Sequence, residues 1–274
     1  PCSRLCSLHR SFKSLRSCSI SLNIAWGDVD ENIFATAAAI EALPNIPDVI
    51  VLPETFSTGY IADNEHIERV AQDWHNSTTI GSMTEWARTY NAAICGTLLI
   101  KDGDQIFNRA VFVEPSGEIT YYDKRHLFAL SKEAKHISAG RRLPPVIRYR
   151  GWNIALAICY DIRFPAWCRN QGLRYDILLV PANWPQARAY AWQNLLKARA
   201  IENQSYVVGA NRSGNDDFGS YDNQTFVFDP MGKSIDNESD NPAVVCATFS
   251  RETLQHLRRS FPVSLDADRF DIEL

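Results

Sequence analysis

The sequence predicts a layered α/β fold in one large domain, and three observations support this. First, from Leu22 onward, short apolar runs bounded by turn residues alternate with longer segments of helical character. Second, no internal repeat, low-complexity linker or change of composition marks a domain boundary. Third, three predicted strands end in polar residues of catalytic type, Glu54, Cys159 and Asn183. The carboxyl ends of strands form the ligand crevice of such folds.

The apolar runs set the predicted strands, and the segments between them set the helices. The predicted strands cover residues 48–53, 92–100, 108–114, 119–122, 152–158, 176–180, 206–210, 224–228 and 243–248. Helices are predicted over residues 32–43, 78–90, 163–170 and 187–204. Asp28 or Asp30 can cap the first helix, and Asp102-Gly103, residues 115–118 and residues 230–233 are turn signals.

Residues 1–21 form an atypical N-terminal segment, so we expect the folded domain to cover residues 22–274. The segment is rich in Ser, Cys, Leu and basic residues and has no acidic residue. That composition matches an organelle transit segment. The rival interpretation is a gene-model error that replaced the first strand, and the lack of clear amphipathic periodicity favours it.

Composition excludes several classes of partner. The 274 residues are 45% hydrophobic and 22% charged, as in an ordinary soluble globular protein. A formal net charge of -4 leaves no excess of cations to neutralise nucleic-acid phosphates or anionic lipids. No stretch reaches about 18 consecutive apolar residues, so no transmembrane helix is expected. We expect neither nucleic-acid nor membrane partners.

The cysteine pattern indicates the compartment. Seven cysteines make an odd count, and no two of them have the C-x-x-C spacing of metal or redox sites. Scattered thiols suggest a reducing environment, so we predict a cytoplasmic protein with no metal site.

Cys159 is a candidate nucleophile. It follows an apolar strand and precedes Tyr160-Asp161, which predicts a strand-to-helix turn. A helix N-terminus there would lower the pKa of the thiol. The alternative is a buried structural cysteine, which is a common fate of a free thiol.

Glu54 and Lys124 are candidate partners of that thiol. Glu54 directly follows Pro53, where a carboxylate either caps the next turn or faces a cleft. Facing Cys159, it could take the thiol proton and later activate water. Lys124 lies in a cluster of cations beside an apolar pair. It is either a solvated surface lysine or a stabiliser of the oxyanion in acyl transfer.

Taken together, these segments resemble the nitrilase superfamily of carbon-nitrogen hydrolases, and within it the omega-amidases. The similarity runs from about Leu22 to the C-terminus. The family's three motifs correspond to LPE at residues 52–54, YDKRHLF at residues 122–128 and ICYDIRFP at residues 158–165. Further similarity lies in PANWP at residues 181–185 and ARAIENQ at residues 198–204.

The resemblance implies a four-layer α-β-β-α sandwich that assembles as a homodimer or a larger homo-oligomer. It implies that Glu54 is the general base, Lys124 the oxyanion stabiliser and Cys159 the nucleophile. Glu133, nine residues after the lysine, matches the family's second glutamate, although a surface glutamate is the alternative. One departure stands out: residues 19–22 replace the hydrophobic run and glutamine of the family's first strand. This difference calls into question the folding of that edge more than the chemistry.

The same resemblance implies hydrolysis of short dicarboxylic monoamides, such as 2-oxoglutaramate, through a thioester and without a cofactor. The substrate's free carboxylate needs a cation or several donors. The candidate substrate-binding residues are Tyr60, Tyr160, Arg163, Asn183 and Trp184. Arg163 could instead pair with Asp161 or another acid, and Tyr60 could be a packed loop residue.

Two rival interpretations stay open. One keeps the three catalytic residues but changes the substrate to a nitrile, an N-carbamoyl compound or deaminated glutathione. The other is a binding homologue that has lost catalysis, which the presence of all three residues disfavours.

Overall fold

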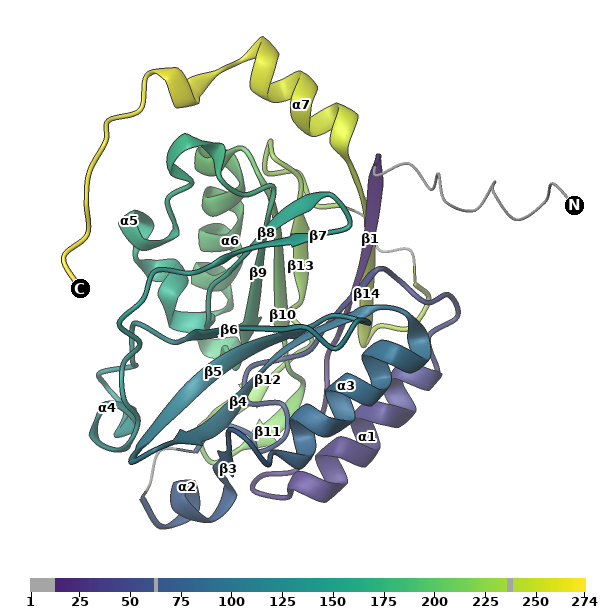
Figure 1. Ribbon diagram of the computed structural model, residues 1–274, viewed down its shortest axis with the longest axis vertical. Coiled ribbons are helices and arrows are strands. Elements are labelled where there is room, and N and C mark those ends of the chain that lie inside the picture. Colours follow the sequence, from purple (N-terminus) through teal and green to yellow (C-terminus); the bar gives the residue numbers. More distant parts are fainter. Residues whose placement is uncertain (1–12, 62–63, 236–238) are drawn as a thin grey trace, which may run out of the picture.

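The fold consists of two stacked β-sheets with helices on both outer faces (Figure 1). The computed structural model describes residues 13–61, 64–235 and 239–274. The first sheet has the order β14 (Val244–Ser250), β1 (Ser14–Ile20), β2 (Val49–Val51), β4 (Ala93–Asp102), β5 (Gln105–Val113) and β6 (Ile119–Asp123), with β3 (Gln72–Asp73) paired to β4. The second has the order β13 (Phe226–Phe228), β10 (Tyr206–Asn211), β9 (Ile177–Ala182), β8 (Trp152–Leu156) and β7 (Val146–Tyr149).

The helices complete the outer layers. The long ones are α1 (Val29–Glu41), α3 (Thr78–Tyr90) and α6 (Ala189–Asn203), and the shorter ones are α2 (Asn64–Val70), α4 (Glu133–His136), α5 (Pro165–Cys168) and α7 (Arg251–Ser260). Helices α1 and α3 cover the first sheet, and α5 and α6 lie beside the second (Figure 1). The hairpin β11 (Gly214–Asp216) and β12 (Gly219–Tyr221) forms a separate two-stranded ribbon.

The alternation of side chains between the two faces of each strand explains the layers. In β2, Val49 and Val51 belong to the core between the two sheets, whereas Ile50 packs in the cluster that contains Ile40 of α1 and Met83 of α3. Side chains of a strand point alternately to its two faces, so a strand with apolar residues on both faces is covered on both. The predicted four-layer α-β-β-α fold is confirmed.

The predicted elements agree closely where the local signals are strong. Helix α3 has its predicted bounds, and the Asp28 side chain accepts a hydrogen bond from the Glu31 N–H at the start of α1. The predicted helix over residues 163–170 is shorter than expected. A 3₁₀ turn, η1 (Cys159–Arg163), precedes the four residues of α5, which begins at Pro165. Proline favours the first position of a helix, so it starts a new helix here.

The expected domain start at residue 22 is wrong, because β1 lies inside the segment that we set apart. It pairs antiparallel with β14 and parallel with β2. Leu15, Cys18 and Ile20 are buried, and so are Ser17 and Ser19 between them. The strand was not predicted because the small buried serines interrupt the apolar pattern that indicates a strand. Residues 1–12 of the segment, which the transit and gene-model interpretations also concern, lie outside the described residues.

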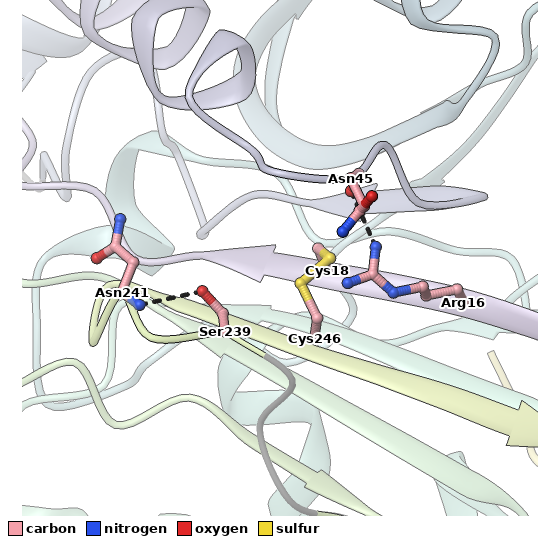
Figure 2. The surroundings of a disulfide bond; sticks show 6 residues. All are labelled: Arg16, Cys18, Asn45, Ser239, Asn241 and Cys246. Carbon is pink, nitrogen blue, oxygen red and sulfur yellow. Dashed lines mark hydrogen bonds between the residues drawn. A yellow bond between two sulfur atoms is a disulfide. The ribbon is translucent and has the colours of Figure 1, made fainter.

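A disulfide joins two strands of the first sheet. Cys18 of β1 and Cys246 of β14 are directly opposite in the antiparallel register, and their sulfur atoms are bonded (Figure 2). Because two of the cysteines are paired, the cysteine pattern no longer supports the prediction of a reducing environment. Cys95, Cys159 and Cys168 are free and buried. Within the described residues, no helix has both the length and the apolar character needed to cross a membrane.

We predict that the disulfide stabilises the fold, because it joins residues 228 positions apart and so restricts the unfolded chain. The double variant Cys18→Ala/Cys246→Ala should lose about 2–4 kcal/mol of unfolding free energy in a urea titration without reductant. In the wild type, non-reducing peptide mapping should recover the two cysteine peptides linked. Recovery of both as separately alkylated peptides would contradict the bond.

Candidate active site

Strand ends from both sheets meet at one place. Glu54 follows β2 of the first sheet, and Asn183 follows β9 of the second. The Glu54 N–H donates to the carbonyl of Ala182 at 3.3 Å, and the Asn183 side-chain amide donates to the carbonyl of Glu54 at 2.8 Å. These contacts join the two sheets where their strands end. The fold thus places the Glu54 carboxylate at the edge between the layers.

A buried ion cluster lies at this junction. The Lys124 ammonium, just after β6, donates to Glu54 Oε1 at 2.9 Å and to Glu133 Oε1 at 2.9 Å. The three side chains are at most 1% exposed. Lys124 and Glu133 are therefore not the solvated surface residues of the alternative interpretations. The cluster holds two carboxylates and one ammonium, so it is one negative charge out of balance when all three are ionised.

The remaining oxygen atoms of the cluster are also hydrogen-bonded. Glu54 Oε2 accepts from the Asn183 N–H at 2.9 Å, and Glu133 Oε2 accepts from the Phe128 N–H at 2.7 Å. Asn108 in β5 donates from its side chain to Glu54 Oε1 at 2.8 Å. Sequence reasoning missed Asn108, and its one signal is a polar side chain inside an otherwise apolar run. These donors fix both carboxylates in place.

Lys124 is held in its charged form. Burial by itself lowers the pKa of this ammonium, but the charges of Glu133 and Glu54 outweigh burial and raise the pKa well above its usual value. A permanently charged ammonium cannot serve as a base. It can stabilise negative charge that develops on a neighbouring atom.

Cys159 lies on the wall of the same cavity. It begins η1, which is separated from the end of β8 by two residues, and has a φ of +42°, in the left-handed region. Thr55, next to Glu54, has a φ of +44°. Non-glycine residues with such values are uncommon and often occur at functional sites. The two strained positions flank the point where the thiol and the carboxylate approach each other.

The predicted lowering of the thiol pKa is wrong. Burial, then the negative charge of Glu54 and a hydrogen bond to it, raise the pKa of Cys159 well above its usual value, while Lys124 acts in the opposite direction. A single turn of 3₁₀ helix does not outweigh burial and a nearby carboxylate. The raised pKa favours the protonated thiol form of Cys159, beside the Glu54 side chain.

Asp161 fixes the turn that carries Cys159 relative to the segment that carries Lys124. Its carboxylate accepts from the Tyr122 hydroxyl at 2.8 Å and from the Ile158 N–H at 3.0 Å, and it lies 2.8 Å from Nδ1 of His126. The suggested pairing of Arg163 with Asp161 is wrong, because these other groups surround Asp161. Within the described residues, Arg163 has no acidic partner.

The site opens into a cavity of about 160 Å³. All five candidate substrate-binding residues line it, together with Glu54, Lys124 and Cys159. Glu133 lies behind Lys124. Sequence reasoning missed the other lining residues, which are Phe128, Ser131, Pro185, Arg188, Phe218 and Tyr221.

Tyr60 has two roles in the structure. Its ring lines the cavity and contacts Phe218 edge-on at 5.2 Å between ring centroids. Its hydroxyl lies 2.6 Å from Oγ of Ser131, which donates to the carbonyl of Phe128 and accepts from the N–H of Glu133. Tyr60 therefore also holds the loop that positions Glu133, as the packed-loop interpretation requires.

The described ranges contain no group of three or more His, Cys, Asp or Glu side chains arranged to hold a metal ion. The site combines a carboxyl group, an ammonium and a thiol. Gathered in one small cavity, these groups suit nucleophilic attack on an acyl carbon.

Comparison with known proteins identifies the family. A family model described as carbon-nitrogen hydrolase matches residues 17–259. The chain therefore belongs to the carbon-nitrogen hydrolase family, and the predicted family and enzyme class are confirmed. Omega-amidase YafV from Yersinia enterocolitica is 41% identical over 252 residues, which cover 90% of this chain and 94% of that protein.

Two further relatives support this assignment. A 2-oxoglutaramate amidase from Bacillus subtilis is 31% identical over 254 residues, covering 89% of this chain and 94% of that one. The crystal structure of XC1258 from Xanthomonas campestris, a CN-hydrolase superfamily protein with an arsenic adduct in its active site, is 35% identical with a TM-score of 0.88. The match covers 95% of this chain and 99% of that chain.

The opposing influences on Cys159 predict how its thiol titrates. Glu54→Gln removes a charge that raises the pKa and leaves the Lys124 ammonium that lowers it, so the pKa of Cys159 should fall. Iodoacetamide should then alkylate Cys159 several-fold faster at neutral pH, because the thiolate is the reactive form. The readout is the alkylation rate against pH by intact mass, with Cys159→Ala to subtract other thiols. A titration midpoint in Glu54→Gln at or above the wild-type value would contradict this prediction.

Proposed function

We propose that this chain is an omega-amidase that hydrolyses short monoamides of dicarboxylic acids, such as 2-oxoglutaramate, and releases ammonia. The observation that carries the proposal is the convergence of Glu54, Lys124 and Cys159 on one small cavity. Each has the state that the chemistry requires: a protonated thiol, a carboxylate beside it and an ammonium that stays charged.

The first half of the reaction forms a thioester. Glu54 takes the proton of Cys159 as the sulfur attacks the amide carbon. The carbonyl oxygen gains negative charge, which Lys124 and a backbone N–H after the nucleophile stabilise. Glu54 then returns the proton to the departing nitrogen, and ammonia leaves. Glu133 acts as a positioning residue, since it holds the ammonium by bonds of 2.9 and 3.3 Å.

The second half releases the acid. Glu54 takes a proton from water, and the resulting hydroxide attacks the thioester carbon. The carbon–sulfur bond breaks, and the proton returns to the sulfur of Cys159. No metal ion or organic cofactor takes part in this sequence.

Cavity size and charge support a short anionic substrate. About 160 Å³ lies well below the ~300 Å³ at which pockets for drug-sized ligands begin. This favours a short monoamide over deaminated glutathione, which is a bulkier molecule. Arg163, which lacks an acidic partner among the described residues, can bind the substrate's free carboxylate, and Asn183, Trp184, Tyr160 and Tyr60 line the same space. The names of the YafV and Bacillus relatives support the same class.

The side chains of Glu54, Lys124 and Cys159 all line the cavity, which disfavours a non-catalytic binding homologue.

Two further expectations stay predictions. They are assembly as a homodimer or a larger homo-oligomer, and a cytoplasmic location.

The test is ammonia release from a panel of 2-oxoglutaramate, succinamate, a short nitrile, an N-carbamoyl amino acid and deaminated glutathione. We expect the highest kcat/KM with the two monoamides. Cys159→Ala should lose roughly 10³-fold or more in kcat, because nothing replaces the nucleophile. Cys95→Ala, which removes another buried free thiol that does not line the cavity, is the matched control. Activity confined to another panel member would replace the proposed substrate, and turnover by Cys159→Ala would refute the mechanism.

A further inference from the structure

Five residues that line the cavity form a closed ring of contacts, which we call the arginine rim: Arg163, Trp184, Arg188, Phe128 and Tyr160. The Arg163 guanidinium carbon lies 4.8 Å from the Trp184 ring centroid and 5.9 Å from that of Tyr160. Tyr160 contacts Phe128 edge-on at 5.2 Å, and the Arg188 guanidinium lies 5.4 Å from the Phe128 ring.

Trp184 contacts both arginines and so completes the arginine rim. While Arg163 lies over its face, its indole N–H donates to the carbonyl of Arg188 at 2.9 Å. The N–H of Arg188 donates in turn to the carbonyl of Pro185 at 3.0 Å. The backbone of Arg188, at the end of the 3₁₀ turn η3 (Gln186–Arg188), is thus fixed beside the cavity, and its side chain rests on Phe128.

The charges of the rim are not compensated by the protein. The lining holds one carboxylate, Glu54, and three cations, of which Lys124 is neutralised by Glu54 and Glu133. Neither arginine forms an ion pair with any described residue. Stacking on aromatic rings holds a guanidinium in place while leaving its in-plane N–H donors available. Two such donors in one small cavity make a site for an anion.

The balance of charge in the cavity gives the second arginine a role. Glu54, Glu133 and Lys124 together leave one negative charge at the reacting end, which repels an incoming carboxylate. Arg163 offsets that charge, and Arg188 then makes the cavity net positive. A cleft with a net positive field concentrates anionic ligands.

We propose that Arg188 is a specificity-determining residue, which with Arg163 binds the substrate carboxylate and selects amides that carry a negative charge at the far end. This inference rests on the proposed amidase function and adds a residue that sequence reasoning did not find.

The experiment compares succinamate with butyramide, which has a methyl group in place of the carboxylate. The readout is the ratio of kcat/KM for succinamate to kcat/KM for butyramide. Arg188→Gln should lower this ratio at least tenfold, mainly through a higher KM for succinamate. Arg188→Lys, which keeps the charge but loses the bidentate fork, should give an intermediate ratio. Arg148→Gln removes another exposed arginine, on β7 and outside the cavity lining, and should leave the ratio unchanged.

A ratio in Arg188→Gln within twofold of the wild-type ratio would overturn the inference. So would an Arg188→Lys ratio as low as that of Arg188→Gln, because the effect would then not follow charge. If the wild type releases ammonia from neither amide, the proposed function itself fails. If it hydrolyses both with an unchanged ratio in the variants, the function stands and the role of Arg188 alone is refuted.

Discussion

The structure depends on one buried ammonium held between two carboxylates. Lys124 lies 2.9 Å from Glu54 and 2.9 Å from Glu133, all three almost fully shielded from water. Burying charges costs several kcal/mol for each ion unless each is paired and hydrogen-bonded. Here Asn108, Asn183 and the Phe128 N–H complete the bonding. Such a cluster gives weak stability but fixes geometry, which is what acyl transfer requires.

The two-sheet fold brings the members of this cluster together. Its members come from the end of β2, the end of β6 and the short helix α4, while the thiol follows β8. Of these elements, only β6 and α4 are consecutive in the chain. Asp161 links the Cys159 turn to the Lys124 segment through Tyr122 and His126. A displaced sheet would therefore disturb the positions of Cys159 and Lys124 together.

Much of the fold and most of the candidate site were predictable from the sequence. Apolar periodicity and turn residues located α3 and the strands β4, β5 and β6, and three motifs located Glu54, Lys124 and Cys159. Strand β1 was missed because its buried serines resemble a polar segment. The predicted direction of the Cys159 pKa shift was wrong because the shift depends first on burial and then on Glu54, which lies more than a hundred positions earlier in the chain. Arg188 was missed because its contacts with Phe128 and Trp184 arise only in three dimensions.

The central claim is that the Cys159 sulfur becomes acylated during turnover. The most direct measurement is acid quenching of the enzyme within its first turnovers on succinamate, followed by peptide mass mapping. The account predicts a mass increase equal to the substrate minus ammonia, on the peptide that contains Cys159 and on no other cysteine peptide. Continued ammonia release with the acyl group on a different residue would contradict it.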